Sequence, residues 1–116
     1  MFYLKERKAM VKWYKYLYVG PRMEKKKKRC VCCIEERRRL YGFHILTLAS
    51  RDGDQLEIMA ARELSQPVLR DRRPMIVGLA ADYAEAMDIL YQIIEDAEAA
   101  GMRGRLRAFI EKQEGI

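Results

Sequence analysis

The chain is poor in the residue types that usually build catalytic and metal sites. It holds one histidine, His44, two serines, one threonine and no asparagine, so pairs of a nucleophile and a base are scarce. We expect His44 to be a strand residue with satisfied ring nitrogens. The sequence predicts no enzyme, no bound metal, no cofactor and no small-molecule substrate.

Cysteine is also scarce, and its three copies, Cys30, Cys32 and Cys33, are crowded together. Such close positions strain a disulfide, and the odd count leaves one thiol over. We therefore expect free thiols that pack as small core residues in a strand, where Cys30 and Cys32 share a side with Ile34 and Cys33 lies opposite. A metal ligand set and a redox sensor are the alternatives for this cluster.

Long apolar runs are absent. No run approaches the roughly 18 to 20 residues that cross a bilayer, and residues 1–10 hold no apolar segment of the signal-peptide kind, so we expect a cytoplasmic protein without a transmembrane segment. The length of 116 residues and the apolar fraction of 50% fit a single globular domain. Residues 1–9 form a charged leader without a pattern, so either Met10 is the true start or the leader is a frayed tail. One α+β domain is expected over residues 10–113.

Charge is divided unevenly along the chain. Residues 1–39 carry 14 Lys and Arg against 4 acids, while residues 40–116 carry 9 against 13, so the first third makes the whole net charge of +6. The acids are concentrated in residues 82–98, a stretch without Lys or Arg. Two interpretations compete: the basic third contacts a polyanion such as nucleic acid, or the two poles contact each other within the molecule or across a homo-oligomer.

The first part of the chain predicts a β-hairpin. Residues 11–19 are rich in aromatic and β-branched side chains and end at Gly20-Pro21, which is typical of a strand followed by a turn. Residues 30–36 have strand character too. We expect the two segments to pair around a long basic tip at residues 22–29.

Three further strands are expected. Residues 41–50 and 55–59 flank the tight-turn sequence of residues 51–54, in which Asp-Gly supplies the positive φ of a hairpin turn. Residues 60–70 favour a short helix or turn that a proline stops. Residues 75–79 are an apolar run typical of a strand covered on both faces.

Residues 82–100 predict a long helix. Asp82 with Glu85 three residues later fits an N-terminal capping box, and Gly101 is a natural stop. One apolar stripe should face the sheet at steps of four and three. Its members are Tyr83, Met87, Leu90, Ile94 and Ala97, widened by Ile93. Residues 106–110 then predict a short last helix.

Together these elements predict an α+β fold: an antiparallel sheet of four or five strands, packed by the long helix and a short C-terminal helix. Both faces of the first and third strands carry apolar side chains, and one long helix covers only one face. The second face is therefore covered by residues 60–70 and the last helix, or by another subunit or a ligand.

Several segments of the chain carry a family pattern. They are Lys-Trp-Tyr-Lys-Tyr-Leu-Tyr-Val-Gly at residues 12–20, Thr-Leu-Ala-Ser at 47–50, residues 56–64, and Val-Gly-Leu-Ala at 77–80 followed by Glu85-Ala86. With these segments the chain resembles a family of small uncharacterised cytosolic proteins from Gram-positive gut bacteria. The resemblance covers most of the chain from Met10 onward. It implies one whole cytosolic domain that starts near Met10, and it carries over no activity and no site residue.

The basic run is the main candidate site. It consists of Lys25, Lys26, Lys27, Lys28 and Arg29, helped by Arg37, Arg38 and Arg39. On a hairpin tip these charges would lie along a phosphate backbone and displace condensed counterions without reading base sequence. The alternatives are a solvated connection that keeps an edge strand from pairing with other chains, and contact with an anionic membrane surface.

A row of tyrosines lies beside this run in the sequence. Tyr14, Tyr16 and Tyr18 alternate with period two, so we expect them on one sheet face near the basic tip. Bases of single-stranded nucleic acid stack on such rows. The same row is expected if the tyrosines belong to the core or contact a partner.

The sequence therefore predicts a non-enzymatic binding module that contacts the nucleic-acid backbone through a basic hairpin. The alternative is a protein-interaction or self-associating module, in which that hairpin docks on the acidic helix face of another copy. This face is expected to be exposed and to consist of Glu85, Asp88, Glu95 and Asp96.

Overall fold

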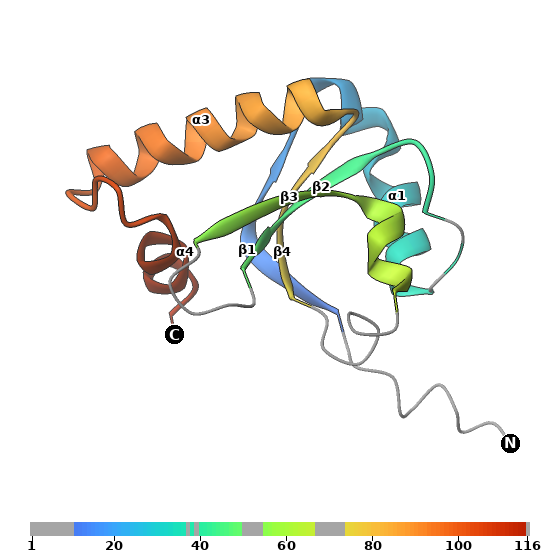
Figure 1. Ribbon diagram of the computed structural model, residues 1–116, viewed down its shortest axis with the longest axis horizontal. Helices are drawn as coiled ribbons and strands as arrows, with labels where there is room; N and C mark the ends of the chain where they lie inside the picture. The colour runs from blue at the N-terminus through green and yellow to red at the C-terminus, as the bar shows by residue number, and fades with distance from the viewer. Residues whose placement is uncertain (1–10, 37, 39, 50–54, 67–73, 116) are drawn as a thin grey trace, which may run out of the picture.

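Nine elements follow one another in the part of the chain that the computed structural model describes, residues 11–36, 38, 40–49, 55–66 and 74–115 (Figure 1). They are β1 (Lys12–Val19), η2 (Pro21–Lys26), α1 (Lys27–Glu35), β2 (His44–Leu48), β3 (Leu56–Ala60), η3 (Ala61–Ser65), β4 (Met75–Ala80), α3 (Tyr83–Ala99) and α4 (Leu106–Glu114), where η denotes a 3-10 helix. The expected leader and the expected turn at residues 51–54 lie outside the described residues.

The four strands form one mixed sheet in the order β1-β4-β2-β3. β1 runs parallel to β4, whereas β2 is antiparallel to both β3 and β4. The α+β class, the antiparallel β2–β3 pair and the buried strand β4 are confirmed. The fully antiparallel sheet and the hairpin of β1 are wrong, because the partner of β1 is the distant β4 rather than the next segment of the chain.

The segment that the sequence predicts as a second strand is helical. Residues 27–35 form α1, directly after the 3-10 helix η2, which begins at Pro21. Proline suits the first turn of a helix, and lysine is a good helix former. Cys30 and Ile34, one helical turn apart, are buried against the sheet. Tertiary packing therefore decided between strand and helix for a short apolar run that local pattern leaves ambiguous.

Helices cover both faces of the sheet (Figure 1). On one face α3 and α4 bury a core that includes Leu46, Val77, Ile93 and Phe109. On the other face α1, η2 and η3 bury a second core that includes Met23, Ile34, Ile45, Leu64 and Leu79. The prediction that residues 60–70 help to cover the second face of the sheet is thus confirmed for η3. The prediction that the last helix lies on this face is wrong, because α4 lies beside α3 on the first face and α1 covers the second.

The ends of α3 agree with the prediction. Asp82 caps its N-terminus, where Oδ1 accepts a hydrogen bond from the backbone N–H of Glu85 at 2.9 Å. The helix stops before Gly101, whose φ of 78° is favourable for glycine. The cap is not a complete capping box, because the Glu85 carboxylate accepts from the N–H of Ala81 instead of from Asp82.

The apolar stripe of α3 is shifted from its expected position. The buried apolar residues are Ala86, Ile89, Ile93 and Ala97. Tyr83 is 57% exposed and Ile94 37% exposed, although both belong to the expected stripe. The buried stripe lies over Gly78 of β4, where an added Cβ would lie 3.4 Å from Ile89.

Candidate functional site

The basic run lies on the outer surface of η2 and the first turn of α1. Lys25 and Lys26 end η2, and Lys27, Lys28 and Arg29 begin α1. All five side chains are exposed. Within the described residues none of them takes part in a salt bridge. The run is therefore a concentrated positive surface on a helix, and not a hairpin tip as the sequence predicts.

Of the three arginines that follow α1, Arg38 belongs to the described part of the chain. Arg38 is exposed and its Nη2 lies 2.7 Å from Oε1 of Glu36, so its charge is already paired. Residues 37 and 39 lie outside the described part of the chain. The contribution of this segment to an anion-binding surface stays a prediction.

The tyrosine row forms, but away from the basic run. Tyr14 and Tyr18 belong to the core shared with α3 and α4, whereas α1 packs on the opposite face of the sheet. Their rings stack with centroids 6.2 Å apart, and the Tyr16 ring meets Tyr14 edge-on at 5.8 Å. Only Tyr16 is largely exposed, at 56%. The expected proximity of the row to the basic tip is wrong, because α1 packs against the other side of the sheet.

Burial changes the chemistry of two of these tyrosines. It raises the pKa of Tyr14 to about 12, with further contributions from Glu114, Tyr16 and Asp96. Burial also raises the pKa of Tyr18, and the hydrogen bond from its hydroxyl to Asp96 Oδ2 adds to the effect. Both phenols therefore stay protonated at neutral pH, and the Tyr18 hydroxyl donates to Asp96.

The four acids of α3 do not form one exposed face. Glu85 is only 5% exposed, which corrects the expectation that it lies at the surface. Its Oε2 accepts from the backbone N–H of Arg22 at 2.8 Å and its Oε1 from that of Ala81 at 2.7 Å. Helical spacing places Glu85 toward the β1 side of α3, where these two backbone groups need an acceptor.

The other three acids differ from one another. Asp96 is half-buried and accepts hydrogen bonds from Tyr18 and from Gln92 Nε2, the latter at 2.9 Å. Asp88 and Glu95 are exposed. The acidic surface of α3 is therefore narrower than the sequence predicts.

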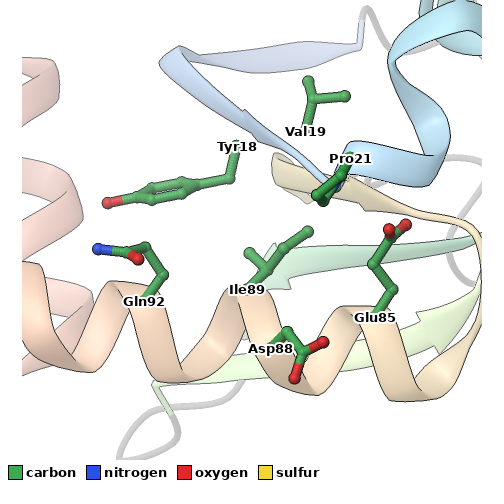
Figure 2. Close-up of a pocket in the computed structure, with 8 residues that line it drawn as sticks. Tyr18, Val19, Pro21, Glu85, Asp88, Ile89 and Gln92 are labelled. Atoms are coloured by element: carbon green, nitrogen blue, oxygen red, sulfur yellow. The ribbon is translucent and has the colours of Figure 1, made fainter.

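Two hollows lie between β1 and the helices α3 and α4, and sequence reasoning did not find them. The first, of about 270 Å³, lies between Tyr18, Pro21 and the side chains of Glu85, Asp88 and Gln92 (Figure 2). The second, of about 410 Å³, is lined by the three tyrosines together with Asp96, Phe109 and Gln113. The signal available in the sequence was the tyrosine row, whose meaning depends on which helix packs beside it.

The three cysteines and His44 are not among the residues that line the two hollows. All three cysteines are free, as expected. Cys30 is buried, which raises its pKa, while the Cys32 thiol donates to Glu36 at 3.0 Å, so these two do not share a side. Nδ1 of His44 is buried without a hydrogen-bond partner among the residues described, contrary to the expectation of satisfied nitrogens.

The described residues contain no group of three or more His, Cys, Asp or Glu side chains placed to hold a metal ion. Nor does any helix in this part of the chain have the length and apolar character needed to cross a membrane. No protein-family model, no curated protein and no solved structure matches the chain. The resemblance to the bacterial family therefore stays an expectation.

Proposed function

We propose that this protein is a non-enzymatic binding module that contacts the nucleic-acid backbone through the surface of Lys25, Lys26, Lys27, Lys28 and Arg29 on η2 and α1. Five neighbouring cations neutralise phosphates and release counterions, which gives affinity without base recognition. This helical surface replaces the hairpin tip in the proposal.

The observation that carries the proposal is the place of the charges on the helix. The first turn of α1 contains no acid and begins with Lys27, Lys28 and Arg29. Cations at a helix N-terminus oppose the macrodipole and cost roughly 0.3 to 1 kcal/mol each. Within the described residues no carboxylate pairs with them to offset this cost. Lys25 and Lys26 lie in the last turn of η2, where cations are favourable. The unfavourable charges are therefore those of Lys27, Lys28 and Arg29, and such a placement is typical of a functional surface.

The positions of the lysines and the tyrosines also bear on the kind of nucleic acid that we expect to bind. The tyrosine row lies on the other face of the sheet, so one strand cannot lie on the lysines and stack on Tyr16 at the same time. Contact is then limited to phosphates. We expect little preference among sequences, and no advantage for single strands over duplexes.

Fluorescence anisotropy with labelled duplex DNA, single-stranded DNA and RNA tests the proposal, at low and near-physiological salt. We expect micromolar binding at low salt with a steep salt dependence. Replacing Lys25 to Lys28 by alanine should weaken binding to all sequences alike and reduce the slope of log K against log salt by about 3 to 4.

A variant of equal charge serves as the control. It replaces Lys12, Arg103, Arg105 and Lys112 by alanine, four exposed residues away from α1. Equal loss of binding in both variants would reduce the effect to net charge and contradict the proposed surface. Absence of binding at low salt would refute the proposal outright.

The second candidate is self-association, in which the basic surface of one copy docks on the exposed acids Asp88 and Glu95 of another. Both acids are free of salt bridges within the described residues. If each copy's basic surface meets the other's acids, such a contact closes a two-fold dimer, and otherwise it builds a ring or a filament. Light scattering distinguishes it: assemblies that dissociate in high salt support self-association, and a monomer at every salt concentration refutes it.

A further inference from the structure

We propose that the groove between β1 and the helices α3 and α4 binds an extended peptide segment that presents one basic and one apolar side chain. The groove consists of the two hollows described above. It lies on the face of the sheet opposite to α1, so this inference goes beyond nucleic-acid contact and does not depend on it.

The shape of the groove suits an extended chain. The two hollows have volumes of about 270 and 410 Å³ and share the side chain of Tyr18, so they follow one another along β1. At about 3.3 Å per residue, the strand from Tyr14 to Gly20 spans roughly 20 Å. A compact ligand fills one hollow, whereas a peptide of about six residues reaches both.

The hollow near Pro21 is complementary to a cation. No Lys or Arg is among its lining residues, although the chain has a net charge of +6. Glu85 already accepts two backbone hydrogen bonds. Asp88 lies at the rim of this hollow and points away from Tyr18 and Pro21 (Figure 2). It is exposed, with no hydrogen bond or salt bridge to another described residue, so its carboxylate is available to the ammonium or guanidinium group of a ligand at the rim.

The hollow at the other end is complementary to an apolar group. Tyr14, Tyr16 and Phe109 supply aromatic walls, and the Tyr16 ring is 56% exposed. The ammonium of Lys15 lies 5.8 Å from the centre of that ring, which disfavours a second cation there. Tyr18 lines both hollows and its hydroxyl donates to Asp96 in the wall of the second, so this carboxylate is already engaged.

The backbone of β1 offers a further means of attachment. β1 is an edge strand whose one neighbour in the described sheet is β4. An edge strand beside a helix can pair with the main chain of an extended peptide, while adjacent hollows select alternate side chains. The N–H of Lys15 already donates to Glu114 of α4, so pairing is expected toward Val19.

Amide NMR spectra of the full chain, titrated with blocked alanine-based peptides, test the inference. The peptides place Arg and Phe two or four residues apart in either order, for example Ac-Ala-Arg-Ala-Phe-Ala-NH2. We expect at least one to bind with millimolar or better affinity and to shift the signals of β1 and of the β1-facing side of α3. Replacing its Arg by Glu should weaken binding at least about tenfold.

Two substitutions at exposed positions of α3 form a matched pair. Asp88→Lys should weaken binding of the Arg peptide at least about tenfold, and Glu95→Lys, the same charge change outside the hollows, by less than about twofold. Tyr16→Ser should weaken the Phe-containing peptide more than one with Ala in place of Phe. Equal effects of the two lysine substitutions, or no shifts with any peptide, would overturn the inference. So would a dimer, seen by sedimentation, that Asp88→Lys dissociates, since the occupant would then be a second copy.

Discussion

Replacing Gly20 by alanine should destabilise the protein strongly, although Gly20 has an ordinary extended backbone with φ of −63°. A Cβ at this position would overlap Cδ and Oε1 of Glu85, well inside van der Waals contact. The Glu85 carboxylate cannot move aside without losing its hydrogen bonds from Arg22 and Ala81. These bonds join the first turn of α3 to the backbone of Arg22 in η2 and of Ala81 after β4.

The magnitude follows from these two hydrogen bonds. Each joins a backbone N–H to a charged group, and such bonds contribute about 1.5 to 3 kcal/mol. Arg22 is exposed and Ala81 is half-buried, so water partly replaces the carboxylate and the low end of the range applies. We expect Gly20→Ala to lower the free energy of unfolding by about 3 kcal/mol, out of the roughly 5 to 15 kcal/mol typical of a domain.

Urea unfolding, followed by far-ultraviolet circular dichroism and by the fluorescence of Trp13, the one tryptophan, measures the loss. A double-mutant cycle with Glu85→Ala isolates the cause. Glu85→Ala alone removes the same two bonds, and the double variant has no clash left to relieve. The double variant should therefore lose about 3 kcal/mol of unfolding free energy, and not twice that amount.

Gly42→Ala is the control for the glycine substitution itself. Gly42 has φ of 84°, and a Cβ added there would meet no atom within 4 Å, so alanine costs only about 1 kcal/mol of backbone strain. If Gly20→Ala were no worse than Gly42→Ala, or if the Gly20 and Glu85 effects added within about 0.5 kcal/mol, the proposed contact would be refuted.

Three further predictions concern the helix register, the cap and the thiols. Ile93→Ala should lower the free energy of unfolding by about 2 to 5 kcal/mol and Ile94→Ala by less than about 1 kcal/mol, because Ile93 is fully buried and Ile94 is 37% exposed. Similar losses for both variants in urea unfolding would favour the apolar stripe expected from the sequence. The hydrogen bond from the Glu85 N–H, and after it the Arg22 guanidinium, lower the pKa of Asp82. Ionised Asp82 therefore stabilises the fold above its ordinary pKa of 3.8, and this stability is lost as the pH falls through the lowered pKa. The stability advantage over Asp82→Asn should therefore shrink on acidification from pH 7 to about pH 3, and a constant difference would contradict the assigned cause. Cys30 is 7% exposed. A variant that keeps Cys30 as its one cysteine should therefore react with a thiol reagent at least about tenfold more slowly than a variant that keeps Cys33. Equal rates would place Cys30 outside the core.

Local sequence signals determined several elements of this protein. Asp82 and Gly101 mark the ends of α3 because capping and the left-handed stop depend on neighbouring residues alone. Alternating apolar side chains and a short connection determined the β2–β3 pair. The split of charge along the chain is likewise a property of the sequence itself.

Other features depended on contacts between distant parts of the chain. The run around Cys30 and Ile34 has strand character, yet it is helical because it buries one side against the sheet. β1 pairs with β4, and no local sequence pattern predicts this pairing.

The candidate site shows the same division. The sequence was sufficient to single out the lysine run and the tyrosine row, but not to place them on opposite faces of the sheet. Glu85 lies outside the apolar stripe expected from sequence, yet it is buried beside Gly20, where its carboxylate accepts from the backbone N–H groups of Arg22 and Ala81. Tertiary structure decided these points, since burial and proximity arise from partners far apart in the chain.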